Sequence, residues 1–209
     1  MNNYKFSEYT TNYISGVMSL RKPQRKSLEI LDDLVGDIDL NKSLDKEVLK
    51  NKAHHNYSIF TDYDRAFPSF TFALATGVGK TRLMGAFVTY LYARKNIKNF
   101  LVVAPSLTIY NKLINDFANS SSSKYVFNGV GCFEFGPHVI SGDEYRKVNF
   151  GNFSDVKIFV YNAQKFNSND ENRRFNSLNE VLGKSFFDYL SELDDLVVLM
   201  DEAHHYRNN

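Results

Sequence analysis

Hydrophobic residues recur along the chain in two alternating patterns, one with the period of a helix and one typical of a buried strand. The helical pattern is clearest over residues 23–34 and 80–94, and a further helix is predicted over 108–118. Continuous apolar runs predict buried strands at 69–75 and 99–104, and two further strands are predicted at 156–161 and 196–200. Because strands alternate with helices, the sequence predicts an α/β fold with a mostly parallel sheet and helices on both faces.

Three segments between these elements have weaker patterns. Residues 37–68 separate the first helix from the first strand and are a candidate insertion at the domain edge. Residues 125–153 contain five glycines and are a candidate hairpin, whereas residues 178–193 have a helical pattern. We interpret residues 1–209 as the N-terminal part of a single domain, because one large domain fits this length.

Composition narrows the class of protein. Hydrophobic residues make up 43% of the chain, enough for a real core, and the formal net charge is only +1. A dedicated nucleic-acid binder usually carries a basic stripe, so any such contact must be local. A single cysteine, Cys132, excludes an internal disulfide and a cysteine-based zinc site. Neither a signal peptide nor an apolar run of membrane length is visible, so we expect a soluble cytoplasmic protein without membrane contact.

The most informative segment joins the apolar run 69–75 to the helical pattern that starts at position 80. Its sequence from position 75 is Ala-Thr-Gly-Val-Gly-Lys-Thr, and a strand before it and a helix after it are the context that a P-loop requires. Glycines let the backbone turn tightly, so that consecutive N–H groups point inward at phosphate oxygens. The residues of this predicted cradle are Thr76, Gly77, Val78 and Gly79.

The two residues that follow supply the remaining phosphate chemistry. Lys80 is expected to reach the β- and γ-phosphates of ATP, and the Thr81 hydroxyl to ligate Mg²⁺. The general P-loop pattern has glycine at position 74, where this chain has Leu74. The competing interpretation is a chance Gly-Lys-Thr in an ordinary strand-to-helix turn.

An acidic pair follows the last predicted strand. Asp201 is expected to hold Mg²⁺, generally through water, and Glu202 to orient and deprotonate the attacking water. An ATPase needs such a base, whereas a nucleotide kinase does not. A competing interpretation makes Asp201, His204 and His205 a transition-metal site, but adjacent histidines do not easily share one metal.

Together the two motifs resemble those of superfamily-two helicases, with the segment 75–81 as motif I and Asp-Glu-Ala-His at 201–204 as motif II. Leu-Ala-Thr-Gly-Val-Gly-Lys-Thr combined with Asp-Glu-Ala-His-His looks like the helicase (Res) subunit of type III restriction enzymes. That family tolerates an apolar residue at the position of Leu74. The resemblance implies a RecA-like P-loop domain that extends from about residue 20 to 206.

Three further segments support the resemblance by their order. Residues 20–24 are similar to the LRxxQ element, which implies that Gln24 reads adenine. Residues 103–107 look like motif Ia, and 160–166 resemble the next strand-to-loop element along the nucleic-acid track. The resemblance places nucleic-acid contacts at Ser106, Thr108, Gln164 and Lys165, and a coupling role at His204.

The resemblance implies ATP-dependent DNA translocation in a longer parent protein, with a modification methyltransferase subunit as partner. Motif III, a second RecA-like domain with its arginine finger, and a nuclease domain have no counterpart in these residues. We therefore expect the strand that ends at Asp201 to lack its usual neighbour. Two alternatives stay open: another superfamily-two DNA or RNA helicase, and a P-loop module that binds nucleotide without hydrolysis. Glu202 argues against the second, because a pure binder needs no base.

Overall fold

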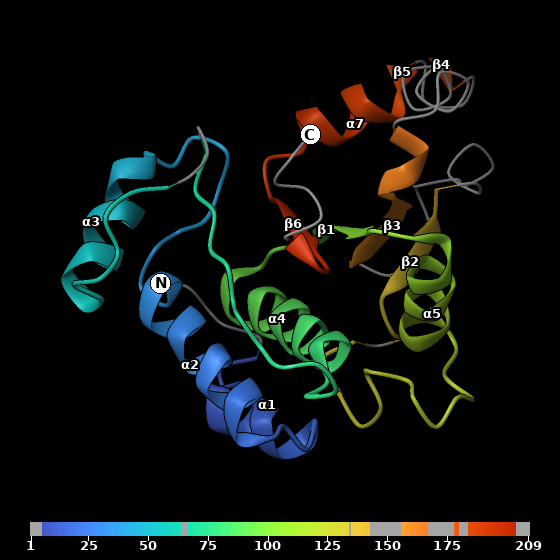
Figure 1. Cartoon of the computed structure of the whole chain (residues 1–209), viewed down its shortest axis with the longest axis horizontal. Helices are drawn as coiled ribbons and strands as arrows, with labels where there is room; N and C mark the ends of the chain where they lie inside the picture. The colour runs from blue at the N-terminus through green and yellow to red at the C-terminus, as the bar shows by residue number, and fades with distance from the viewer. Residues whose placement is uncertain are drawn as a thin grey trace. The chain divides into compact units, whose positions relative to one another are not determined.

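The computed structural model describes residues 6–63, 67–133, 135–142, 156–166, 178–179 and 184–203. The chain divides into two compact units, residues 1–96 and 97–209. Figure 1 shows the helices of the first unit in blue to green, and the strands and helices of the second in green to red.

In the first unit the described secondary structure is helical. The helices are α1 (Thr11–Val17), α2 (Lys22–Val35), α3 (Lys46–Asn56) and α4 (Lys80–Lys95). α1 and α2 pack against α4, and α3 packs against α2 (Figure 1). The side chains of Thr10 and Asp45 accept backbone N–H groups of the first turns of α1 and α3, which explains where these helices begin. The helices predicted over 23–34 and 80–94 are confirmed.

Two polar contacts fasten α2 to α4 near the C-terminal end of each helix. The hydroxyl of buried Tyr90 donates a hydrogen bond to the Asp32 carboxylate, and Lys95 Nζ donates to the Gly36 carbonyl over 3.1 Å. Burial, and then the hydrogen bond to Asp32, raise the pKa of Tyr90 above its ordinary value, so the hydroxyl stays a neutral donor at physiological pH. Both contacts restrict sliding of α2 along α4.

The strand predicted at 69–75 is wrong. This segment has no hydrogen-bond ladder, although its exposure alternates: Phe72 and Leu74 are partly buried, whereas Thr71 and Ala73 are exposed. The Phe72 ring packs 4.9 Å from that of Phe87 in α4, measured between centroids. A strand needs a neighbouring strand for its backbone hydrogen bonds, and the described residues of this unit contain none. The apolar composition of residues 69–75 therefore reflects the partial burial of alternate side chains and not pairing with another strand.

The second unit is built around a parallel sheet. Its strands are β1 (Asn99–Ala104), β2 (His138–Ser141), β3 (Lys157–Asn162) and β6 (Leu196–Met200), in the order β2-β3-β1-β6. All of its pairings are parallel, and they place Val103 opposite both Tyr161 and Met200. The strands predicted at 99–104, 156–161 and 196–200 are confirmed, as is the α/β class.

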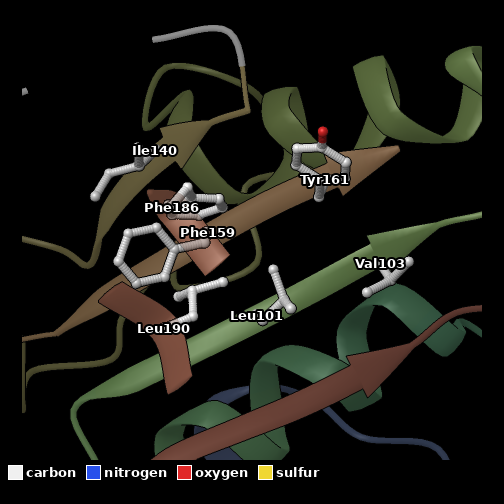
Figure 2. Close-up of a cluster of buried hydrophobic side chains, with 7 residues drawn as sticks. All are labelled: Leu101, Val103, Ile140, Phe159, Tyr161, Phe186 and Leu190. Carbon is white, nitrogen blue, oxygen red and sulfur yellow. The ribbon is translucent and has the colours of Figure 1, made fainter. Parts of the chain in front are cut away.

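Two α-helices of this unit pack against the sheet, α5 (Leu107–Ala118) and α7 (Phe186–Glu192). A short 3-10 helix, η1 (Ala163–Phe166), follows β3 directly. α5 packs against β1, β2 and β3 (Figure 1). Figure 2 shows side chains of β1, β2 and β3 meeting two residues of α7. The buried residues of this cluster are Leu101, Val103, Ile140, Phe159, Tyr161, Phe186 and Leu190.

Two weaker predictions in this unit need correction. Within 125–153, the strand at 138–141 pairs in parallel with β3, so its described residues do not form the predicted hairpin. Among the described residues of 178–193, only 186–192 are helical, and β4 (Leu178–Asn179) and β5 (Lys184–Ser185) form an antiparallel pair. The hydroxyl of Ser185 accepts the Asp188 backbone N–H over 3.0 Å, and this cap sets the start of α7.

β6 lies at one edge of the described sheet, where it pairs with β1 alone. Its residues Val198 and Met200 are 48% and 45% exposed, although a strand interior of this apolar sequence is usually buried. Among the described residues, no helix is long and apolar enough to cross a bilayer.

Asp195 joins the beginnings of β1 and β6. One of its carboxylate oxygens accepts the Lys98 backbone N–H and the other accepts the Asn99 side-chain amide, each over 2.6 Å. Asp195 immediately precedes β6, and Lys98 immediately precedes β1. One carboxylate therefore fixes where these two strands start to pair.

We expect Asp195→Ala to lower the free energy of unfolding by about 1–3 kcal/mol, because two donors lose their acceptor in a partly buried place. Urea unfolding followed by circular dichroism measures this loss. The matched control is Asp194→Ala, since Asp194 is the exposed neighbour, and its effect should stay within about 0.5 kcal/mol. Equal losses in the two variants would contradict the role of Asp195 in joining the strands.

Candidate functional site

The glycine loop turns sharply into the first residue of α4. Gly77 and Gly79 have φ values of 80° and 99°, in the left-handed region that glycine adopts without strain. Gly79 is the N-cap of α4, and the Val78 N–H donates to the Ala75 carbonyl over 3.4 Å, which closes the turn. A side chain at position 77 would meet no atom within 4 Å, so space on that side of the loop is open. The backbone conformation fits a cradle for phosphate groups.

The loop leads into the N-terminus of α4, which is the positive end of the helix dipole. Lys80 and Thr81 are its first two residues; Thr81 is buried and Lys80 partly buried, whereas Thr76 in the loop is exposed. The first turn contains no acidic residue, and Arg94 and Lys95 lie in the last turn. Backbone N–H groups and the helix dipole together favour an anion at such an N-terminus.

The N-terminal turn of α2 contacts the glycine loop directly. The Gln24 amide nitrogen donates to the Gly79 carbonyl over 2.7 Å, and Arg21 Nη1 donates to the Gly77 carbonyl over 3.1 Å. Gln24 also accepts the Arg21 backbone N–H over 2.7 Å, and it is only 1% exposed. Residues far apart in the sequence thus meet at the loop. The sequence analysis singled out Gln24 but missed Arg21, although both belong to the segment 20–24.

The outer face of α2 beside this contact is hollowed and positively charged. An open hollow of about 580 Å³ is lined by Leu20, Lys22, Arg25, Lys26 and Glu29. The one carboxylate among them, Glu29, lies 3.7 Å from Lys26 Nζ. The local excess of cations contrasts with the net charge of +1 for the whole chain.

The acidic pair lies directly after β6. The Asp201 N–H donates to the Val103 carbonyl over 3.1 Å, which extends the pairing with β1 by one residue. Glu202 has a φ of 50°, and its N–H donates to Asp201 Oδ1 over 3.0 Å. A non-glycine residue in this region is uncommon and costs roughly 1 kcal/mol or more. The turn therefore holds the Asp201 carboxylate close to the end of the strand.

The histidines of the competing transition-metal interpretation, His204 and His205, lie outside the described residues, as does the coupling role assigned to His204. Among the described residues, no group of three or more His, Cys, Asp or Glu side chains is placed to hold a metal ion.

The residues predicted to contact nucleic acid follow neighbouring strands of the second unit. Because Ala104 of β1 pairs with Asn162 of β3 in a parallel register, the segments that follow the two strands both begin at the carboxyl ends of the strands. Ser106 caps α5 by accepting the Ile109 N–H over 3.4 Å. Polar groups of both segments therefore lie at the carboxyl ends of these two strands.

Of the other predicted contacts, Thr108 and Gln164 are exposed. Lys165 belongs to η1, and its side chain lies outside the described part of the chain. The sequence analysis did not single out Asn162, a buried residue whose side-chain oxygen accepts the Gln164 N–H over 3.0 Å. This bond shapes the turn that presents Gln164.

Comparison with known proteins gives two findings. Residues 18–209 match the family described as "Type III restriction enzyme, res subunit". A relative from Haemophilus influenzae, described as a probable type III restriction-modification enzyme HindVIP Res subunit, is 30% identical over 141 residues. That alignment covers 64% of this chain and 24% of the relative, so the chain spans about a quarter of the relative's length. No solved structure matches the chain.

The family match extends over nearly the whole chain and includes the glycine loop, the strand β6 and the acidic pair. The parallel sheet with packed helices agrees with the RecA-like class that the sequence resemblance implied. The chain therefore belongs to the family of type III restriction enzyme Res subunits, as a helicase-like segment.

Proposed function

We propose that this chain is the ATP- and DNA-binding motor segment of a type III restriction enzyme, and that it serves ATP-dependent DNA translocation in the whole protein. The observation that carries the proposal is the glycine loop at the start of α4, with Gly77 and Gly79 both in the left-handed conformation. In a member of the Res family, a loop of this shape is best explained as a phosphate-binding loop.

The proposed phosphate and metal roles follow from the chemistry of each side chain. The loop 76–79 would surround the phosphates with backbone N–H groups, and the Lys80 ammonium would balance the charge of the β- and γ-phosphates. The Thr81 hydroxyl and the Asp201 carboxylate are oxygen ligands of the kind Mg²⁺ prefers. Bound Mg²⁺ would neutralise charge that develops on the phosphates during hydrolysis.

Glu202 is the proposed base that orients the attacking water, because it follows the metal-binding Asp201 directly. This assignment favours a hydrolysing motor over a module that only binds nucleotide. Gln24 is the proposed adenine contact. A glutamine amide has two N–H groups and two oxygen lone pairs, and Gln24 uses one of each on the protein backbone. This leaves one N–H and one lone pair for an adenine edge, which would have to reach a side chain that is only 1% exposed here.

For DNA, the proposed contacts are Ser106, Thr108, Gln164 and Lys165. Hydroxyl, amide and ammonium groups of this kind bind phosphate oxygens without reading base sequence. His204 would couple the nucleotide site to the rest of the enzyme. A modification methyltransferase subunit is the proposed partner, since the Haemophilus relative is described as part of a restriction-modification enzyme. A cytoplasmic location follows from this role in DNA restriction.

Two titrations of the same chain test the proposal. Calorimetry should show saturable binding of Mg·ATP. A fluorescently labelled DNA duplex should bind weakly. Because Lys165 is the one cation among the proposed contacts, the affinity for the duplex should fall only about 3- to 4-fold between 50 and 200 mM salt. Tight DNA binding that persists at high salt would contradict the proposed contacts, and absence of Mg·ATP binding would contradict the proposed nucleotide site.

A further inference from the structure

Two backbone carbonyls of the glycine loop are held by side chains of one helix turn. Arg21 donates to the Gly77 carbonyl over 3.1 Å, and Gln24 donates to the Gly79 carbonyl over 2.7 Å. Neither donor belongs to the loop or to α4. The conformation of the loop therefore depends on a segment that lies more than 50 positions earlier in the sequence.

The direction of these carbonyls decides where the loop's N–H groups point. In a trans peptide the C=O and N–H bonds point to opposite sides, and none of the described peptide bonds is cis. Holding the carbonyls of Gly77 and Gly79 toward α2 turns the N–H groups of Val78 and Lys80 away from α2. The Val78 N–H meets the Ala75 carbonyl at 3.4 Å, a long bond that a phosphate oxygen can replace.

α2 is held against α4 near its C-terminal end by the contacts of Asp32 with Tyr90 and of Gly36 with Lys95. Before α2 begins, Arg82 of α4 donates over 3.1 Å to the carbonyl of Met18, the residue that ends α1. The helix turn that carries Arg21 and Gln24 therefore lies between two points at which the chain is fastened to α4.

The close approach of Gln24 leaves no room for a side chain at position 79. A Cβ atom at that position would lie 2.7 Å from the Gln24 amide nitrogen, closer than real Cβ atoms approach other atoms. Glycine at position 79 therefore serves the backbone conformation and the approach of Gln24 at once.

We propose that Arg21 and Gln24 are positioning residues that hold the glycine loop in its phosphate-binding curve. This inference rests on the proposed function, because it presumes that the loop binds nucleotide phosphates. It differs from adenine recognition in a measurable way. A residue that reads the base affects only ligands that have one, whereas a residue that shapes the loop affects every ligand with a polyphosphate chain.

Inorganic tripolyphosphate separates the two roles, because it carries the phosphates of ATP without base or ribose. Calorimetric titrations of Mg·tripolyphosphate and Mg·ATP are compared for wild type, Arg21→Ala, Arg21→Lys and Gln24→Glu. Arg21→Ala should weaken both ligands by the same factor, about 3- to 10-fold, which corresponds to one hydrogen bond. Arg21→Lys should restore part of the loss, because lysine keeps a donor of similar reach.

Gln24→Glu preserves the volume of the side chain and the acceptor for the Arg21 backbone N–H. Its second oxygen would face the Gly79 carbonyl without a hydrogen to share, so both ligands should lose about tenfold in affinity. Any additional loss for Mg·ATP alone measures the adenine contact proposed for the same side chain. Arg25→Ala removes a charge one turn further along α2, where no contact with the loop carbonyls is recorded among the described residues. Its expected effect is about twofold or less.

The outcomes are distinguishable. If Arg21→Ala and Gln24→Glu weaken Mg·ATP but leave Mg·tripolyphosphate unchanged, the two side chains act on the base and the positioning role is overturned. Losses from Arg25→Ala as large as those from Arg21→Ala would show that charge alone matters, which also overturns it. If wild type binds neither ligand, the proposed function itself fails. Thermal unfolding of each variant establishes that the titrated protein is folded.

Discussion

Replacing Lys80 by alanine is expected to weaken Mg·ATP binding by about 10- to 100-fold. The lysine is the first residue of α4, directly after the glycine loop, and it supplies the cation proposed for the β- and γ-phosphates. Hydrogen bonds to charged groups contribute roughly 1.5–3 kcal/mol, and each 1.4 kcal/mol corresponds to a factor of ten in affinity. Calorimetric titration of wild type and Lys80→Ala measures the change.

The matched control for this prediction is Lys95→Ala. Lys95 is the last residue of the same helix, about 22 Å away along its axis. Its removal deletes the same charge and one hydrogen bond to the Gly36 carbonyl. The folded protein should bind Mg·ATP within about twofold of wild type. Equal affinity of wild type and Lys80→Ala for the nucleotide would refute the assignment of the phosphate loop.

The chain of 209 residues, taken alone, is expected to bind nucleotide with almost no DNA-stimulated hydrolysis, unwinding or cleavage. The resemblance read from the sequence implies an arginine finger in a second RecA-like domain, and no residue of this chain is proposed to fill that role. In related phosphoryl transfers such an arginine contributes roughly 10³- to 10⁵-fold in rate. A phosphate-release assay on this chain, with and without DNA, compares wild type with Glu202→Gln.

Phosphate release by wild type and by Glu202→Gln should both stay near the background of the assay, and DNA should raise neither. Glutamine keeps the size of the side chain but cannot accept the proton of the attacking water. Turnover by the 209-residue chain itself that DNA accelerates, and that Glu202→Gln removes, would show that catalysis needs no residue from elsewhere.

Local patterns predicted the elements whose formation depends on neighbours in sequence. α2 and α4 were predictable because apolar residues recur at helical spacing, and because Pro23 favours the first turn of α2. The glycine loop was predictable for the same reason, since its conformation requires glycine at positions 77 and 79 whatever surrounds it. β1 and β3 are apolar enough to indicate burial without knowledge of their partners, whereas the equally apolar β6 leaves Val198 and Met200 exposed.

Elements that depend on distant partners were harder to predict. The apolar segment 69–75 has the composition of a strand, but pairing needs a second strand that its sequence does not specify. β2 has only four residues, and it forms because β3 lies alongside it. The contact of Arg21 with Gly77 joins residues 56 positions apart, and an arginine at a helix start gives no local indication of such a partner.

The close approach of Gln24 to Gly79 has a consequence for how the protein can change during evolution. Any side chain at position 79 must occupy the place of the Gln24 amide, and it must also tolerate a φ of 99°. A smaller residue at position 24 would make room, but the strained backbone would persist. Replacement of Gly79 is therefore opposed on two separate grounds, and a change at position 24 would remove only one of them.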